Sequence, residues 1–406
     1  MKNISTIVPN PLLKYLRTDL PGRFNEINVL KTHKERFLRV LRTGDILPPY
    51  EVLIHPSSVC NQKCEWCIGG KILEEEGKNN KDILANSLSN PKNMEKVIEG
   101  ILNYQKDGFR IENVSFSGIT GEPFMSKKSF MLAIEMLSKY QIRTGVFSNG
   151  GLIDDDLIKI LLKMNYINVS LDAITPETFI ALKYGNRSCG KIVFSKIIKN
   201  ITTLAVLKKE TGSNLDINAS FVLYPDNYHE IFEAAKVLKS LGVSNLRIKQ
   251  DISRKKLLSE KQKIEAEDLI ANAKKLEDDN FKFIVIHRIN VPSDMERGFQ
   301  TCTVSDLIAS IGSDGNVYPC NYQCHKDSPF YGNAIEKSFK DIWEGERRKE
   351  VKMRLPSICS ANCDPFKNRS NRLFQIIKDT YEDYGNEVAE KFIQEIIEFK
   401  EGSIYV

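Results

Sequence analysis

Strand-like and helix-like segments alternate along most of the chain, and this alternation limits the fold more than any other feature. Short runs rich in β-branched and aromatic residues are separated by stretches with helical periodicity. Such regular β–α units imply parallel strands joined by right-handed crossovers, although the pattern does not choose between an open sheet and a barrel. The predicted strands are residues 51–55, 113–117, 143–147, 166–170, 216–223, 244–248 and 281–286, with a helix expected at about residues 92–106.

A group of three cysteines follows the first predicted strand directly. Cys60, Cys64 and Cys67 have the spacing Cys-x3-Cys-x2-Cys, and three thiolates this close together are expected to hold one soft metal centre. A structural zinc or an ordinary [4Fe–4S] cluster takes four cysteines, so three leave one cluster iron open to a small molecule. Trp66 places an apolar ring beside this centre and keeps water away. A zinc knuckle completed by His55 is the alternative interpretation.

Cys-x3-Cys-x2-Cys with an aromatic residue before the third cysteine resembles the signature of the radical S-adenosylmethionine (radical SAM) superfamily. The resemblance implies a partial (β/α)6 barrel and a [4Fe–4S] cluster whose open iron is chelated by S-adenosylmethionine. It also implies reductive cleavage of S-adenosylmethionine to methionine and a 5′-deoxyadenosyl radical, which abstracts hydrogen from a substrate C–H bond. An external electron donor such as flavodoxin or ferredoxin is then expected as a partner.

Three later strand ends resemble cofactor-binding segments of the same family. The stretch from Ser117 to Pro123 is similar to its Gly-Gly-Glu-Pro segment, which binds the amino group of S-adenosylmethionine, although Thr120 replaces the first glycine. Ser148 and Asn149 resemble its Thr-Asn-Gly segment, which implies contacts with the ribose or the carboxylate. Each signal alone is equally typical of a plain strand-end turn. The candidate cofactor-binding residues, together with Trp66, are Gly121, Glu122, Pro123, Ser148, Asn149, Ser170 and Asp172.

The cysteines after residue 300 have a different context. Asp314-Gly315 between short apolar runs predicts a hairpin. The spacing of Cys302, Gly315 and Cys320 resembles the SPASM/twitch extension of radical SAM proteins, which binds auxiliary iron–sulfur clusters. The resemblance implies one auxiliary [4Fe–4S] cluster, and a structural zinc is the alternative. The expected ligands are Cys302, Cys320, Cys359 and Cys363, with Cys324 possible.

These observations predict an α/β protein in which a partial (β/α)6 barrel carries a small C-terminal α+β twitch/SPASM-like domain. The predicted division is a cap segment (1–48), the barrel (49–295), the auxiliary cluster domain (296–370) and a closing helix (371–406). A helix near residues 35–42 is expected either to cap the barrel and touch substrate or to be an ordinary surface helix. Residues 69–91 are expected to form a surface loop or lid.

Composition limits the partners. The chain has 406 residues and a net charge of +5, which favours neither nucleic acid nor a membrane as partner. No apolar run has the length of a membrane span or a signal peptide, so we expect a cytoplasmic protein. Nine cysteines in such a chain are expected to be metal ligands rather than disulfides.

The expected reaction is an oxidation in which the auxiliary cluster accepts an electron. We expect dehydrogenation or deoxygenation of a small molecule of the saccharide, aminocyclitol or nucleotide type. Arg247 and Lys249 form either a cationic rim for a phosphorylated or carboxylated substrate or solvated charge at a strand end. Three alternatives remain: a maturase acting on a precursor peptide or protein, a redox-neutral epimerase with Cys189 or Cys324 as hydrogen donor, and a non-enzymatic metal-binding protein.

Overall fold

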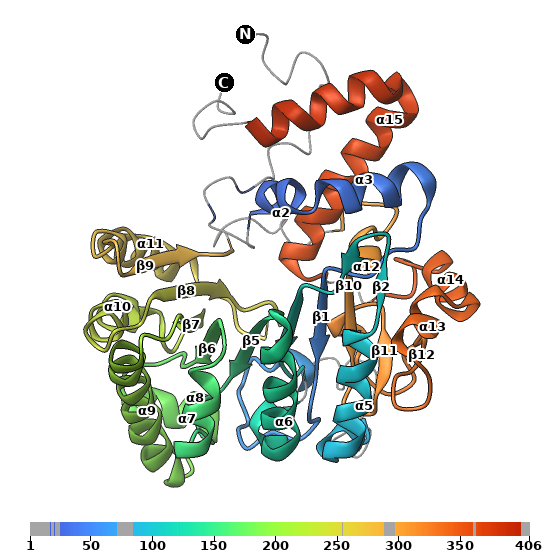
Figure 1. Ribbon diagram of the computed structural model, residues 1–406. Coiled ribbons are helices and arrows are strands. Elements are labelled where there is room, and N and C mark those ends of the chain that lie inside the picture. Colours follow the sequence, from blue (N-terminus) through green and yellow to red (C-terminus); the bar gives the residue numbers. More distant parts are fainter. Residues whose placement is uncertain are drawn as a thin grey trace.

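The computed structural model describes residues 17, 20, 25–70, 84–119, 121–253, 255–287, 297–359 and 363–398. Thr120, most of the predicted loop over residues 69–91 and much of the predicted cap segment lie outside these residues. Within them, the main sheet has ten strands in the order β12-β11-β10-β1-β4-β5-β6-β7-β8-β9. Figure 1 shows this sheet as the centre of the molecule, with helices along its outer side.

Seven strands of this sheet follow one another in parallel and confirm the predicted α/β fold with its parallel barrel strands. Each predicted strand is present to within two residues. Polar and apolar positions alternate, so that one set of side chains faces the barrel interior and the other faces the helices. The strands are β1 (Glu51–Ile54), β4 (Asn113–Phe116), β5 (Arg143–Ser148), β6 (Tyr166–Ser170), β7 (Asp216–Leu223), β8 (Asn245–Gln250) and β9 (Lys282–Val285).

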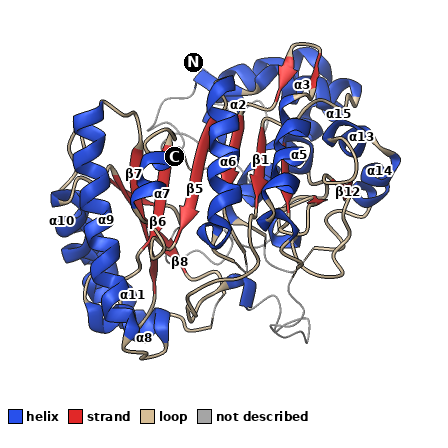
Figure 2. Cartoon of the chain, turned by 60° about the horizontal axis from the view of Figure 1, so that its bottom comes forward, coloured by secondary structure: helices blue, strands red, loops and turns tan. Residues whose placement is uncertain are grey.

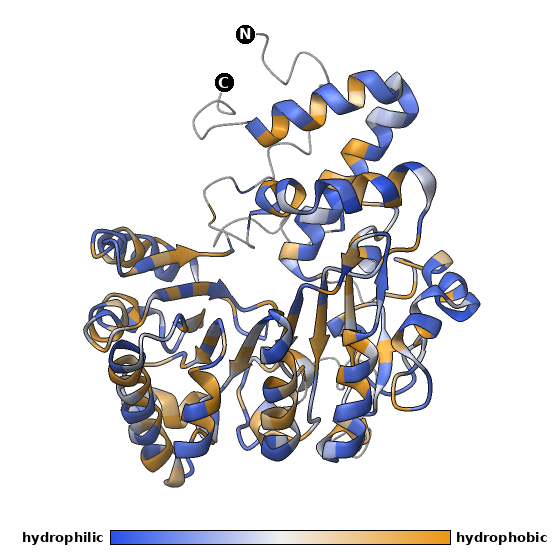
Figure 3. Cartoon of the chain, viewed as in Figure 1, coloured by the Kyte–Doolittle hydropathy of each residue, from blue (hydrophilic) through white to orange (hydrophobic). Residues whose placement is uncertain are grey.

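The helices that cover the outer face of this sheet bury one apolar side and expose the other. Figure 2 shows them outside the strands, and Figure 3 shows stripes of both hydropathy classes along them. Thr175 begins one of them by accepting a hydrogen bond from the Thr178 N–H. These helices are α5 (Pro91–Leu102), α6 (Lys127–Leu137), α7 (Asp155–Leu161), α8 (Pro176–Tyr184), α9 (Cys189–Thr211), α10 (Ile231–Ser240) and α11 (Glu260–Lys274).

The helix predicted over residues 92–106 ends four residues earlier than expected. It ends at Leu102, because the following segment forms a small hairpin of β2 (Gln105–Lys106) and β3 (Phe109–Arg110). The turn residues Asp107 and Gly108 both have positive φ, of 50° and 80°. An Asp-Gly pair in this conformation matches the twist of a two-residue hairpin and outcompetes continued helix.

The C-terminal cysteine region continues the barrel sheet. β10 (Ile308–Ile311) pairs in parallel with β1, and Glu51 is opposite Ile308. The predicted hairpin at Asp314-Gly315 is present, since β11 (Asn316–Tyr318) returns antiparallel to β10 and is followed by β12 (Gly332–Asn333). β1 therefore has a strand on each side, one from the barrel and one from the C-terminal region. The short helices of this region are α12 (Val304–Leu307), α13 (Phe339–Glu344) and α14 (Glu346–Met353).

The described N-terminal helices pack against the C-terminal helix. α2 (Glu26–Thr32) and α3 (Lys34–Thr43) share an apolar cluster with α15 (Pro365–Glu398), which is kinked at Gly385 (Figure 1). In this cluster the rings of Phe37 and Phe374 stack with centroids 4.4 Å apart. Arg36 donates to the Arg110 carbonyl, just before β4. These helices thus lie at the amino ends of the strands, opposite the cysteine loop, and the structure gives no support to a substrate-touching cap.

Candidate active site

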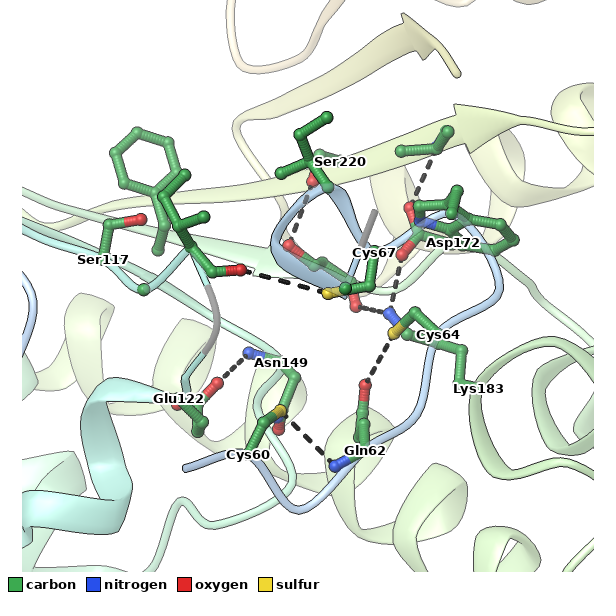
Figure 4. A pocket seen from close by; sticks show the side chains of 18 of the residues that line it. Cys60, Gln62, Cys64, Cys67, Ser117, Glu122, Asn149, Asp172, Lys183 and Ser220 are labelled. Carbon is green, nitrogen blue, oxygen red and sulfur yellow. Dashed lines mark hydrogen bonds and ion pairs between the residues drawn. The ribbon is translucent and has the colours of Figure 1, made fainter. Parts of the chain in front are cut away.

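The three clustered cysteines line one cavity at the carboxyl ends of the barrel strands. Cys60, Cys64 and Cys67 lie on the loop after β1, and the cavity has a volume of about 650 Å³ (Figure 4). The loop is tied to the end of α8, because the N–H groups of Lys63 and Glu65 donate to carbonyls of that helix at 3.0 and 3.1 Å. The barrel therefore fixes a loop whose thiols all face the same space.

Apolar packing surrounds part of this loop. Trp66 is 9% exposed and packs on Tyr224, with ring centroids 5.1 Å apart. Burial raises the pKa of the Cys64 thiol to about 12, while the charge of Lys183 opposes the shift. Metal binding at this loop must therefore displace a thiol proton, as is general for cysteine ligands.

Glycine allows the second loop to approach the cysteine loop. A Cβ atom on Gly121 would lie 2.0 Å from the Ser57 carbonyl oxygen, so only glycine fits there. The next residue, Glu122, is buried, and its carboxylate accepts from the Ser148 hydroxyl at 2.6 Å and the Asn149 N–H at 2.8 Å. Pro123 begins a short 3₁₀ turn behind it. Glu122 therefore joins two strand-end loops, and its carboxylate is engaged by the protein itself.

Asn149 connects this assembly to the cysteine loop. Its side-chain amide donates to the Asn61 side-chain oxygen at 2.7 Å and lies 3.8 Å from the Cys60 sulfur. Ser148 both donates to Glu122 and accepts from the Gly150 N–H. Both predicted residues therefore line the cavity and also order its loops. Figure 4 shows Asn149 between Glu122 and the cysteine loop.

A buried ion pair lies at the end of β6. The ammonium of Lys183 is 2.6 Å from the Asp172 carboxylate, and the two side chains are 1% and 2% exposed. Lys183 also donates to the Ser170 carbonyl, and the other Asp172 oxygen accepts from the Val222 N–H at 2.9 Å. Ser170 and Asp172 therefore line the cavity as predicted, and Lys183 is a cavity residue that the sequence did not indicate.

The opposite wall comes from the ends of β8 and β9. Lys249, Lys255 and His287 line the cavity there. Arg247 lies one layer deeper, 7% exposed, and donates to the Asn168 side chain at 3.2 Å. Arg247 is therefore neither part of a cationic rim for substrate nor a solvated charge at the strand end. Alternate residues of a barrel strand point to the interior at successive depths, and Arg247 occupies a deeper position than Lys249.

Asp251 is the acidic residue of this wall. It is 2% exposed and lines the cavity. One carboxylate oxygen accepts from the Ser253 N–H at 2.7 Å, and the other has no hydrogen-bond partner among the described residues. A buried carboxylate oxygen without a donor is costly, so this atom is a candidate contact for a ligand.

The C-terminal cysteines form a second site. Cys302, Cys320, Cys359 and Cys363 line one small cavity of about 40 Å³, and burial raises the pKa of the Cys359 thiol to about 12. Cys324 is absent from this lining and packs with Leu84 and Tyr318. The four predicted ligands thus line one cavity, and Cys324 does not.

Comparison with known proteins identifies the family. The sequence model of the radical SAM superfamily matches residues 54–238, and that of the SPASM iron–sulfur cluster-binding domain matches residues 302–364. The chain is a radical SAM enzyme with an SPASM domain. Its cofactors are a [4Fe–4S] cluster and S-adenosylmethionine in the radical SAM domain, and auxiliary iron–sulfur binding in the SPASM domain adds a further cluster cofactor. The non-enzymatic alternative is therefore wrong.

Relatives and solved structures agree with this assignment. The radical SAM enzyme is 25% identical over 311 residues to a tungsten-containing aldehyde ferredoxin oxidoreductase cofactor-modifying protein of Pyrococcus furiosus, covering 72% of this chain and 80% of the relative. Streptococcus suis SuiB bound to S-adenosylmethionine has a similar fold, with a TM-score of 0.57 at 16% identity, covering 92% of this chain and 82% of SuiB. Native anSMEcpe with bound AdoMet has a TM-score of 0.54 at 19% identity, covering 85% of this chain and all of that chain.

The residues of the radical SAM enzyme fit its cofactors. The three cysteine thiols face one cavity, and Gly118 and Gly121 of the neighbouring loop line the same cavity. The zinc-knuckle alternative has no support at His55, because its Nδ1 accepts the Ile119 N–H at 3.1 Å and His55 is not among the residues that line the cysteine cavity. Among the described residues, no set of three or more His, Cys, Asp or Glu side chains is arranged to hold a single metal ion.

Cys189 and Cys324 were the candidate hydrogen donors of a redox-neutral epimerase. Cys189 is exposed at the start of α9 and is not among the residues that line the active-site cavity, so the structure gives no support to its role as a hydrogen donor. Cys324 lines neither cavity.

In the part of the chain that the structure describes, no helix is both long and apolar enough for a bilayer span.

Proposed function

We propose that this radical SAM enzyme oxidises a C–H bond of an anionic small molecule, of the class of cofactors and their precursors. The observation that carries the proposal is that Lys249 and Lys255 line the same cavity as the three clustered cysteines. Cationic side chains in a partly enclosed site favour carboxylated or phosphorylated ligands. The name of the Pyrococcus furiosus relative, a cofactor-modifying protein, supports the same substrate class.

In this proposal the two cysteine sets have separate tasks. Cys60, Cys64 and Cys67 hold the cluster that binds S-adenosylmethionine. The auxiliary cluster is held by Cys302, Cys320, Cys359 and Cys363, without Cys324. When bound, these groups supply a 5′-deoxyadenosyl radical that takes a hydrogen atom from the substrate, and an acceptor for one electron.

The residues of the chain position the reactants and handle the proton. Lys183 supplies a buried positive charge beside Cys60 and Cys64, and Asp172 keeps its ammonium in place. Trp66 and Tyr224 exclude water from one side of the cavity. Asp251 accepts a hydrogen bond from a substrate hydroxyl or amine, and it takes the proton that is lost when the substrate radical gives up its electron.

His287 adds a neutral donor to the substrate wall. Burial lowers its pKa to about 3, so the imidazole is uncharged at neutral pH. Its Nδ1 accepts the Gln250 N–H at 3.1 Å, and therefore Nε2 carries the proton. We propose that this N–H donates to a substrate oxygen.

A peptide substrate is the second candidate. It is favoured by the solved complex of Streptococcus suis SuiB with the precursor peptide SuiA, which has a TM-score of 0.55 with this chain at 16% identity. A likeness at this identity concerns the fold, whereas the cationic wall belongs to this chain. The expected saccharide or aminocyclitol substrate has no support beyond the cavity itself, and the external electron donor and the cytoplasmic location remain predictions.

The test is the formation of 5′-deoxyadenosine by the anaerobically reconstituted, reduced enzyme. Metabolites below peptide size are separated into anionic and non-anionic fractions, and a peptide fraction serves as comparison. We expect the anionic fraction to stimulate 5′-deoxyadenosine formation, and Lys249→Met and Asp251→Asn to lose the stimulation while basal cleavage continues. Stimulation by the peptide fraction alone would instead assign the enzyme to peptide modification.

Iron content tests the assignment of the cysteines. The reconstituted wild type should hold about eight irons, and a variant with Cys60, Cys64 and Cys67 changed to Ala should hold about four. Cys324→Ala should keep the wild-type content. A triple variant without iron would mean that the C-terminal cysteines hold no cluster.

A further inference from the structure

Two side chains of α15 donate to sulfurs of the auxiliary cysteines. The ammonium of Lys367 lies 3.3 Å from the Cys320 sulfur, and the side-chain amide of Asn371 lies 3.4 Å from the Cys302 sulfur. Residues four apart on a helix share one face. Because α15 begins two residues after Cys363, one short segment provides a cysteine and both donors.

The surroundings hold both donors in place. The Asn371 side-chain oxygen accepts the Val304 N–H at 2.9 Å, so its NH2 group must face the sulfur. Asn371 is fully buried. Lys367 is 9% exposed, and its ammonium also donates to the Asn321 side chain. Neither donor can turn away to water without breaking a second contact.

Positive charge and hydrogen-bond donors at the cysteine sulfurs change the reduction potential of a cluster that these sulfurs hold. A cluster becomes more negative when it is reduced, so nearby positive charge and N–H donors stabilise its reduced form and raise its reduction potential. The effect is strong in a buried site, where water does not screen it.

We propose that Lys367 and Asn371 raise the reduction potential of the auxiliary cluster, and thereby make it an acceptor for the electron that the oxidised substrate releases. The substrate radical loses one electron and one proton, and the auxiliary cluster gains the electron. This inference rests on the proposed function, because it requires the four C-terminal cysteines to hold a cluster. Lys367 and Asn371 are positioning residues, since they act through the cysteine sulfurs.

The experiment is a redox titration of the reconstituted full-length protein, followed by EPR (electron paramagnetic resonance). The variant with Cys60, Cys64 and Cys67 changed to Ala isolates the auxiliary signal and assigns it in the wild type. At the wild-type midpoint, we expect Lys367→Met to lower the ratio of reduced to oxidised auxiliary cluster about tenfold, equivalent to about 59 mV for one electron. Lys367→Arg, which keeps charge and donors, should stay within about twofold of wild type.

Two further variants complete the design. Asn371→Asp replaces the donating NH2 with an acceptor of the same shape, so it should lower the potential even if Lys367→Met fails to assemble. Lys378→Met is the matched control, because Lys378 lies on the same helix, 37% exposed and paired with Glu382. An unchanged midpoint in Lys367→Met and Asn371→Asp, with the cluster present, overturns the inference alone. Absence of iron from the triple-alanine variant overturns the proposed auxiliary cluster itself.

Discussion

At the scale of single residues, the Asp172–Lys183 pair has the clearest energetic consequence. Both charges are buried, at 2% and 1% exposure. We expect Lys183→Met to lower the free energy of unfolding of the cofactor-free protein by about 3–5 kcal/mol, because it leaves a buried carboxylate without its partner. The measurement is urea unfolding followed by circular dichroism.

The double variant Asp172→Asn/Lys183→Met is the control for this prediction. Asn keeps an acceptor for the Val222 N–H and tolerates the positive φ of 62° at this position. It should therefore recover part of the lost stability. A single Lys183→Met variant as stable as the wild type would contradict the ion-pair interpretation.

At the scale of elements, the junction of α2 and α3 should make stability depend on pH. His33 stacks on Tyr50 with centroids 3.9 Å apart, and burial lowers its pKa from 6.5 to about 4, against the raising effect of Glu112. The unfolded chain therefore binds a proton at higher pH than the folded protein. Stability should fall as the pH drops from 6.5 to 4, by about 3 kcal/mol from this group.

His33→Phe isolates this contribution. The variant keeps a ring against Tyr50 but cannot be protonated. Its loss of stability between pH 6.5 and pH 4, measured by urea unfolding at several pH values, should be smaller than that of the wild type. An equal loss in both proteins would show that the buried imidazole does not govern this range.

The elements also show what could be predicted from the sequence. The parallel strands were predictable because β-branched runs recur between helical stretches. The grouping of Cys60, Cys64 and Cys67 at one cavity was predictable because they lie within eight residues. The C-terminal cysteines lie far apart in the chain, and their grouping was predictable only from the resemblance to the SPASM/twitch extension. Lys183 was not, since a basic residue in the last turn of a helix is typical of a solvated end. The pairing of β10 with β1 was not predictable either, because it joins segments far apart in the chain.

At the scale of the whole molecule, both ends of the chain contribute to one apolar cluster. Phe392 is fully buried in this cluster, which also includes Phe37 of α3 and Leu307 just before β10. We expect Phe392→Ala to lower the free energy of unfolding by about 3–5 kcal/mol. It should also speed proteolytic cleavage of the N-terminal segment, because α2 and α3 lose their support.

A surface variant of the same helix is the matched control. Tyr384 is 53% exposed, so Tyr384→Ala should change the unfolding free energy by less than about 0.5 kcal/mol. The measurements are urea unfolding and limited proteolysis read by mass spectrometry. Equal proteolysis of the N-terminal segment in both variants would contradict a shared cluster.

The place of β10 beside β1 has a consequence for biosynthesis. β1 pairs with β4 on one side and with β10 on the other. On the ribosome, the nascent chain exposes β1 long before the hairpin of β10 and β11 is synthesised. During that interval the strand that leads to the cysteine loop is a sheet edge with unpaired backbone groups, which attract other chains. Translation arrest or truncation before residue 308 is therefore expected to yield an aggregation-prone intermediate.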